Sequence, residues 1–220
     1  MCGRFLQLVP NKQLRQLLGI DIETGLSSTA LLEPNPRPRY NIAPTQHADV
    51  VLPIDDHLSI ESLYWGLRST NSGTLLINAR LETAETKPTF TNAWTSARCI
   101  VPISGYYEWQ QSHGASTKQP WLINRPAEPV IWAAGLTFGL SPRSFVILTT
   151  AAPPKTPLGA IHDRVPVMLT LEDARRWLAF DAAQIALTKG NFAAVEKLAL
   201  AIFDGPRDRA AEAAAAALAE

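Results

Sequence analysis

Apolar runs rich in β-branched and aromatic residues recur along most of the chain, separated by turn residues. They occupy positions 49–54, 58–67, 75–80, 98–109, 121–124, 130–136, 144–150 and 165–169. Short runs of this composition are typical of strands. The pattern therefore predicts a protein whose core is a largely antiparallel sheet system.

Two stretches near the start of the chain do not follow the strand pattern. In 11–20, Leu14, Leu17 and Leu18 fall on one face of a helix, and Asn11 precedes them as the expected N-cap. Residues 31–46 contain four prolines, which deny the backbone the donors that regular structure needs. We expect a short helix at the first stretch and an ordered loop at the second.

The pattern becomes helical from Thr170 onwards. Thr170 is placed as an N-cap, and Asp173 three residues later gives the spacing of a capping box. The final stretch, 209–220, favours helix intrinsically but has too little apolar surface to anchor it firmly. No internal repeat or linker separates these parts, so a single α+β domain is expected.

Composition excludes several classes of protein. The 220 residues contain two cysteines, which is no basis for a disulfide framework and fits a reducing, cytoplasmic compartment. Polar residues interrupt the first twenty positions, where a secretory signal needs an apolar stretch, and no apolar run approaches the ~20 residues of a membrane span. The net charge of zero counts against a nucleic-acid-binding protein unless the basic residues share one face.

One cysteine follows the start methionine directly, in MCGRF. A small residue at this position favours removal of Met1, which leaves Cys2 with a thiol and a free α-amine on adjacent carbons. Such an aminothiol condenses with an aldehyde to an imine and then closes a thiazolidine ring. It can also attack an amide, with the amine as base. Arg4 lies close enough in sequence to lower a thiol pKa and to attract anions.

Three further residues, Cys99, Glu108 and His162, could have either a reactive or a purely structural role. Cys99, flanked by apolar residues, is expected to be a small buried hydrophobe. Strand alternation puts Glu108 on the face opposite Trp109, where it either meets solvent or occupies an apolar pocket that raises its pKa. His162 lies in a loop and is either a surface residue or a proton-transfer group. The four histidines lack metal-ligand spacing.

Basic and amide side chains gather in two motifs. Asn78 and Arg80 share one face at a strand end, where an amide and a guanidinium suit an oxygen-rich or phosphate ligand. Arg37 and Arg39 stand beside Tyr40 and Asn41. This mixture of basic and aromatic residues suits a nucleic-acid backbone.

Taken in order, a series of short motifs resembles the SOS response-associated peptidase (SRAP) family from residue 2 to about residue 169. The motifs are MCGRF, RYNIAPTQ, WGL, INARLET, RCIVPISGYYEW, KQPWLI, AGLTF, FVILTTAA and IHDRVPVML. The resemblance implies one SRAP-like α+β domain over 2–220, with a largely antiparallel, barrel-like sheet core flanked by helices. The helical portion, 170–220, resembles the family least.

The resemblance also implies an activity, namely recognition of abasic sites in single-stranded DNA and covalent crosslinking through Cys2 after loss of Met1. Cys2 would form a thiazolidine with the ring-opened sugar, and Asn78 would position the sugar or the amine. Glu108 would serve as acid and base, and His162 would orient or protonate the sugar oxygen. The DNA-binding residues implied are Arg4, Arg39, Asn41, Arg80, Lys87, Phe90 and Thr149.

The resemblance implies no metal, no other cofactor and no membrane partner. It implies a monomer that turns over slowly or reacts only once. The expected location is the cytoplasm, and the nucleoid if the source is bacterial. The crosslink would shield the lesion during replication and repair. Lyase and autopeptidase activity could accompany the crosslinking. The alternative is an N-terminal-cysteine amidohydrolase or a thiol autopeptidase. The related opening of class II glutamine amidotransferases is broken here by Arg4.

Overall fold

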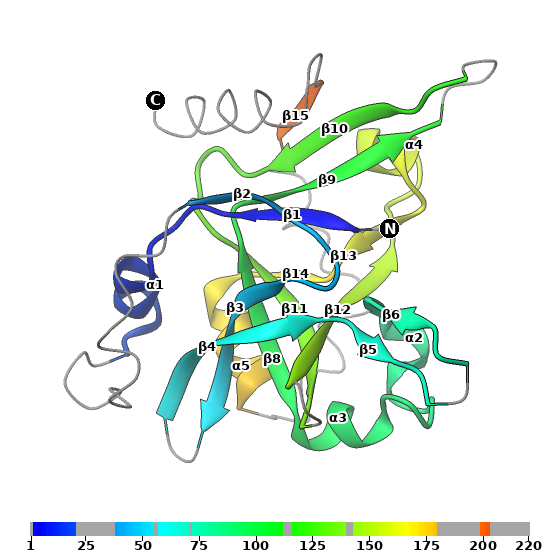
Figure 1. Cartoon of the computed structure of the whole chain (residues 1–220). Coiled ribbons are helices and arrows are strands. Elements are labelled where there is room, and N and C mark those ends of the chain that lie inside the picture. Colours follow the sequence, from blue (N-terminus) through cyan, green and yellow to red (C-terminus); the bar gives the residue numbers. More distant parts are fainter. Residues whose placement is uncertain are drawn as a thin grey trace.

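The computed structural model describes residues 2–20, 38–54, 57–70, 72–111, 116–139 and 143–179, and the backbone of 199–202. Strands make up most of the described chain (Figure 1). The strands are β1 (Arg4–Gln7), β2 (Arg39–Ile42), β3 (His47–Ile54), β4 (His57–Trp65), β5 (Leu67–Arg68), β6 (Leu75–Leu76), β7 (Asn78–Arg80), β8 (Arg98–Ile103), β9 (Gly105–Gln110), β10 (Gln119–Asn124), β11 (Ile131–Phe138), β12 (Ser144–Ala151), β13 (Arg164–Pro166), β14 (Met168–Leu169) and β15 (Ala199–Ile202). The helices are α1 (Asn11–Leu18), α2 (Leu81–Ala84), α3 (Thr91–Ser96), α4 (Pro157–Ile161) and α5 (Leu171–Leu178).

The larger sheet closes on itself. Its strands follow the order β13-β12-β4-β3-β8-β11-β14, and β11 also pairs with β12, so that β12, β4, β3, β8 and β11 form a ring. Most pairs are antiparallel, while β12 runs parallel to β4 and to β7. The α+β class, with a largely antiparallel, barrel-like core, is confirmed.

The smaller sheet has the order β15-β10-β9-β1-β2 and is antiparallel between the strands whose register is given. Figure 1 shows β10, β9, β1 and β2 above the ring strands β3, β4, β11 and β12. Phe5 of β1 pairs with Tyr106 of β9, and both belong to the core cluster that ring residues also enter. One apolar layer therefore joins the two sheets.

Aromatic rings form the centre of that layer. The ring centroids of Phe5 and Trp65 are 4.8 Å apart, and those of Trp65 and Phe145 are 6.3 Å apart in a stacked arrangement. The indole N–H of Trp65 donates a hydrogen bond to the Ile77 carbonyl at 3.0 Å. Large buried aromatics dominate core energetics, so these contacts hold β1 against β4 and β12 and fix the start of the chain in place.

The helix caps agree only in part with the sequence. The Thr170 hydroxyl accepts a hydrogen bond from the Asp173 amide at 3.1 Å, which confirms the predicted start of α5. At α1 the prediction of Asn11 as N-cap is wrong, because Pro10 occupies that position. Proline is tolerated there since helix N-termini do not need its missing N–H.

Several strand predictions also need correction. The runs 58–67, 75–80 and 165–169 each form two strands, which are β4 and β5, β6 and β7, and β13 and β14. The run 98–109 forms two strands in different sheets, β8 and β9, with a break at Ser104. The part of 31–46 expected to be irregular contains β2, because its residues after Pro38 pair with β1. The earlier part of that loop, with Arg37, and the tail at 209–220 lie outside the described residues.

Candidate functional site

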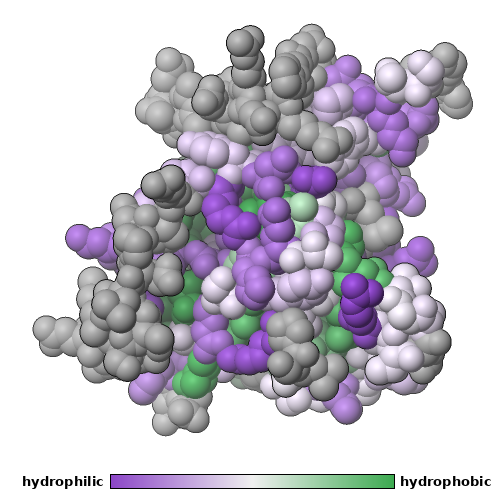
Figure 2. Space-filling view, in the orientation of Figure 1, coloured by the Kyte–Doolittle hydropathy of each residue, from purple (hydrophilic) through white to green (hydrophobic). Residues whose placement is uncertain are grey.

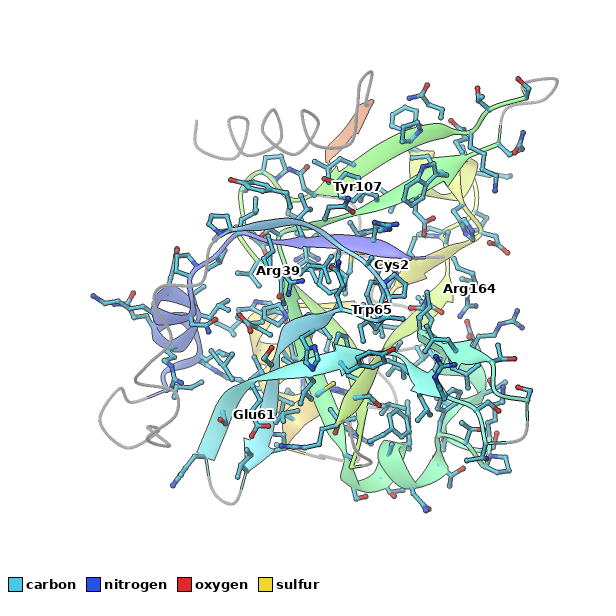
Figure 3. All side chains as sticks on the ribbon, viewed as in Figure 1. Cys2, Arg39, Glu61, Trp65, Tyr107 and Arg164 are labelled. Atoms are coloured by element: carbon cyan, nitrogen blue, oxygen red, sulfur yellow. The ribbon has the colours of Figure 1, made fainter. Side chains whose placement is uncertain are left out.

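Cys2 lies directly before β1 and is fully buried. Figure 3 shows it at the start of β1, in the part of the view where Arg164 projects. Burial raises the pKa of the Cys2 thiol well above its usual range, and the charge of Glu108 adds to the effect. The resting sulfur is therefore protonated, and it needs a partner to accept its proton before or during attack.

Asn78 anchors the backbone of Cys2. Its side-chain N–H donates a hydrogen bond to the Cys2 carbonyl at 3.0 Å. The parallel pairing of β7 with β12, which puts Asn78 opposite Ile147, holds Asn78 in place. Its amide oxygen is buried and makes no hydrogen bond to any residue that the structure describes. That oxygen is available to an N–H or O–H group that enters the site.

Glu108 of β9 is 2% exposed, so the pocket alternative holds rather than the solvent one. Burial raises the pKa of its carboxyl, while nearby positive charge, including that of His162, acts in the opposite direction. Desolvation disfavours the anionic form of a carboxyl group. Glu108 therefore has the property that a proton donor and acceptor near neutral pH requires.

His162 follows α4, a short helix whose first turn the Thr156 hydroxyl caps by accepting a hydrogen bond from Gly159. The Nδ1 atom of His162 lies 3.0 Å from the Arg164 amide N–H and 2.7 Å from a carboxylate oxygen of Asp163. The hydrogen bond from the Arg164 amide requires an unprotonated Nδ1 that accepts it. The contact with Asp163 requires a protonated Nδ1 that donates to the carboxylate. The two contacts therefore belong to different protonation states of His162. In the neutral ring the proton is on Nε2.

Arg164 is a residue of this region that sequence reasoning did not select. Its guanidinium forms a bidentate pair with Glu82, with N–O distances of 2.7 and 2.8 Å. The hydrogen bonds from Arg164 lower the pKa of Glu82 to about 2. Arg164 also donates to the carbonyl of Thr149 and, at 3.3 Å, to its hydroxyl. The pair therefore ties β13 to α2 and β12.

The structure links the four predicted catalytic residues through successive interactions. Asn78 binds the Cys2 backbone, the Glu108 charge acts on the Cys2 thiol, and the His162 charge acts on Glu108. These residues come from β7, the start of β1, β9 and the end of α4. Fold topology brings them together from separate parts of the chain. Cys99 lies in β8 and is fully buried, which confirms the prediction of a buried hydrophobe.

Three of the predicted DNA-binding residues, Arg4, Arg39 and Asn41, lie on β1 and β2 and make hydrogen bonds within the protein. Arg4 donates to the Asn41 amide oxygen at 3.1 Å across the β1–β2 pair. Arg39 donates to the His47 carbonyl and to the Gln46 side chain, the latter at 3.3 Å. In Figure 2 hydrophilic residues gather over the middle of this face, where Figure 1 places β1 and β2.

Arg80, at the end of β7, is exposed. Lys87 lies 5.5 Å from the ring centroid of Phe90. Phe90 is only 3% exposed and packs against Phe138, with ring centroids 6.3 Å apart. A base has no open face of this ring to stack on, and the DNA-binding role expected of Phe90 stays a prediction. Thr149 is likewise buried and contacts Arg164 instead of solvent.

Residues 1–201 match the family model described as SOS response associated peptidase (SRAP). The chain belongs to the SRAP family. The match includes every residue of the candidate site and extends past the region in which the motifs are recognisable by eye.

Two relatives with similar sequences are named for one kind of DNA lesion, the abasic site. The chain is 36% identical to the abasic site processing protein YedK of Escherichia coli (strain K12) over 184 residues, 81% of this chain and 79% of that protein. It is 32% identical to the abasic site processing protein YoqW of Bacillus subtilis (strain 168) over 189 residues, 81% of this chain and 80% of that one.

Solved structures share the SRAP fold of this chain. A phage-related protein of Bordetella bronchiseptica has a TM-score of 0.72 at 24% identity, covering 93% of this chain and 95% of its own. A protein of Bacteroides thetaiotaomicron has a TM-score of 0.71 at 21% identity, covering 93% of each chain. At these identities the likeness shows the fold alone.

Two features are absent from the described part of this SRAP chain. No group of three or more histidine, cysteine or acidic side chains is placed there to hold a metal ion. Of the helices that the structure describes, none has the length and apolar character needed to cross a membrane.

Proposed function

We propose that this SRAP protein recognises abasic sites in single-stranded DNA and forms a thiazolidine crosslink to them through Cys2 after Met1 is removed. The observation that carries the proposal is the position of Cys2, buried, anchored by Asn78 and close to a carboxyl whose pKa burial raises. The names of the relatives, which are abasic site processing proteins, support the choice of lesion.

The first chemical step joins the Cys2 amine to the aldehyde of the ring-opened deoxyribose. The amine attacks the aldehyde carbon, the carbonyl electron pair moves to oxygen, and that oxygen takes a proton. A second proton then reaches the oxygen, and water leaves as the carbon–nitrogen double bond forms; the amine nitrogen loses two protons over the step, which balances the two that the oxygen gains. Glu108 in its protonated form supplies the proton, and its raised pKa keeps that form populated at higher pH than is usual for a glutamate.

The second step closes the ring. The Cys2 sulfur attacks the imine carbon, the carbon–nitrogen electron pair returns to nitrogen, and the proton lost by the thiol ends on that nitrogen. Because burial raises the pKa of the thiol, the sulfur loses its proton as it attacks, with the Glu108 carboxylate as acceptor. Asn78 fixes the Cys2 carbonyl, so amine and sulfur approach the same carbon.

Orientation of the sugar falls to His162 in this proposal. Neutral His162 accepts the Arg164 amide at Nδ1 and carries its proton on Nε2, which then donates to a sugar oxygen. Arg4, Arg39 and Asn41 would hold the DNA backbone on the polar face, and Arg80 and Lys87 would contact flanking phosphates. Phosphate contacts position a nucleic acid without specifying its sequence.

The test compares the wild type with Cys2→Ala and with Cys99→Ala, using single-stranded DNA that bears one abasic site. We expect a heat-stable protein–DNA adduct in the wild type and in Cys99→Ala, and none in Cys2→Ala. Cys2→Ala should still bind the DNA non-covalently. An equal adduct yield in Cys2→Ala would exclude Cys2 as the nucleophile. A mature Cys2 terminus that forms no adduct would instead favour amide hydrolysis.

A further inference from the structure

Tyr106 is a buried tyrosine in the same strand as Glu108, two residues before it. Residues two apart in a strand point to the same face of the sheet, and Tyr106 shares its core cluster with Cys2. The side chain has no exposed surface. Its hydroxyl makes no hydrogen bond to any group in the part of the chain that the structure describes.

Strand register places Tyr106 beside the start of the chain, because it pairs with Phe5, three residues after Cys2. Burial raises the pKa of Tyr106 well above its usual value, and negative charge on Cys2 and on Glu108 raises it further. These charges act only on a group nearby in the low-dielectric interior. The hydroxyl therefore keeps its proton at neutral pH and can donate a hydrogen bond there.

The next residue shows how this strand satisfies the hydroxyl of a neighbouring tyrosine. Tyr107 points to the opposite face, and its hydroxyl donates to the Tyr40 carbonyl at 3.1 Å. Most buried hydroxyls in folded proteins have such a partner. A phenylalanine at position 106 would pack against Phe5 equally well without burying an unsatisfied group. The Tyr106 hydroxyl thus lacks an acceptor within the described chain, at a point where a substrate is expected to bring one.

We propose that Tyr106 is a further catalytic residue, whose hydroxyl donates a hydrogen bond to the aldehyde oxygen of the opened deoxyribose. This inference rests on the proposed crosslinking function. The aldehyde carbon must lie within bonding distance of the Cys2 amine, so its oxygen enters the region that Cys2, Glu108 and Tyr106 surround.

The role of Tyr106 is electrostatic and leaves the atom balance of the reaction unchanged. As the amine adds, negative charge develops on the aldehyde oxygen, and a donor already aimed at that oxygen stabilises the charge without reorganisation. The proton that the oxygen finally takes comes from Glu108, and water leaves. Tyr106 keeps its own proton throughout, and aldehyde and aminothiol give thiazolidine and water.

The test is the Tyr106→Phe variant, with Tyr107→Phe as its matched control. Both changes remove one hydroxyl from adjacent residues of β9 and keep the ring. We expect the single-turnover crosslinking rate at saturating DNA to fall on the order of a hundredfold in Tyr106→Phe. Its affinity for a tetrahydrofuran abasic analogue, which has no aldehyde, should match that of the wild type. Tyr107→Phe should crosslink at nearly the wild-type rate.

Two further readouts separate catalysis from a packing effect. The melting temperature of Tyr106→Phe should equal or exceed that of the wild type, since an unsatisfied hydroxyl is removed. The pH dependence of its residual rate should keep the wild-type shape, because Tyr106 does not titrate. A wild-type rate in Tyr106→Phe, or equal rate losses in both variants, would overturn the inference and leave the proposed function standing. If the wild type forms no adduct at all, the proposed function fails and this inference with it.

Discussion

Two carboxylates near the candidate site experience opposite surroundings. The Glu82 side chain is 45% exposed and paired in bidentate fashion with Arg164, which lowers its pKa to about 2. Glu108 is 2% exposed, and burial raises the pKa of its carboxyl. The same side-chain type is thus held as an anion in one place and has a raised carboxyl pKa, as a proton carrier would need, in the other. The comparison separates the residues that hold the site from those that react in it.

The two carboxylates are connected through residues 162–164. Glu82 fixes the Arg164 side chain, while the Arg164 amide donates to His162 at 3.0 Å. His162 in turn acts on the pKa of Glu108. A change at Glu82 is therefore expected to reach the reaction only through the position of His162, whereas a change at Glu108 removes the proton carrier itself.

Of the substitutions proposed, Glu108→Gln should have the largest effect on the crosslinking rate. We expect the crosslinking rate to fall about a hundredfold or more, because the amide cannot exchange the proton that imine formation needs. The variant should nevertheless melt at a higher temperature than the wild type at neutral pH, since it removes a charge that is costly to bury. Single-turnover rates and thermal melts of the two proteins test both statements. Equal rates would remove Glu108 from the mechanism.

The pH dependence of stability tests the raised pKa of Glu108 directly. Because the pKa of Glu108 is raised in the folded state, the folded chain binds more protons than the unfolded chain between the usual glutamate pKa of about 4.3 and the raised value. The contribution of this group to the free energy of unfolding therefore falls as pH rises through that window. Subtracting denaturation curves of Glu108→Gln from those of the wild type at several pH values should show this slope. A flat difference would contradict the raised pKa.

Glu82→Gln should have a smaller and different effect. We expect a loss of at most about 1 kcal/mol of stability at pH 7, since the pair is partly exposed to solvent, and a several-fold lower crosslinking rate. Its pKa of about 2 lies below the usual value, so this stabilisation is complete above about pH 5 and is lost as pH falls towards 2. Denaturation at pH 7 and pH 2 checks this expectation. The difference between the two proteins should shrink at the lower pH.

Arg80→Ala is expected to have the smallest effect on the reaction. DNA affinity should fall by a few-fold and the salt dependence of binding by about one phosphate contact, while the crosslinking rate at saturating DNA stays unchanged. Arg143→Ala is the matched control, because Arg143 pairs with Glu61 away from the site. Fluorescence titrations at several salt concentrations measure the slope. An unchanged slope would exclude Arg80 from the interface.

Much of the fold could be predicted from local pattern, but not the change of sheet at Ser104. The run from Arg98 to Trp109 is apolar almost throughout, so nothing in its periodicity marks a break. Gly105 explains the new direction, because a Cβ there would lie 2.9 Å from both the Ile123 carbonyl oxygen and a Leu6 methyl group. Only a residue without a side chain lets β1, β9 and β10 approach this closely.

The candidate site could be predicted where short motifs carry it. Cys2 and Glu108 stand out by their immediate neighbours, and burial decided which alternative holds for Glu108. The pair of Arg164 and Glu82 joins residues far apart in sequence, and pairing of that kind leaves no local signal. The packing of Phe90 could not be predicted, because an aromatic ring near a lysine has the same local sequence whether it faces DNA or, as here, packs against Phe138.

The most direct test of the central claim is the intact mass of the protein after reaction with single-stranded DNA bearing one abasic site, with and without sodium borohydride. We expect a starting mass without Met1. We also expect an adduct equal to protein plus DNA minus one water, which forms in the same yield with or without the reductant because a thiazolidine needs no trapping. An adduct that survives only after borohydride treatment would show an imine without ring closure. That result would contradict the role assigned to the Cys2 sulfur.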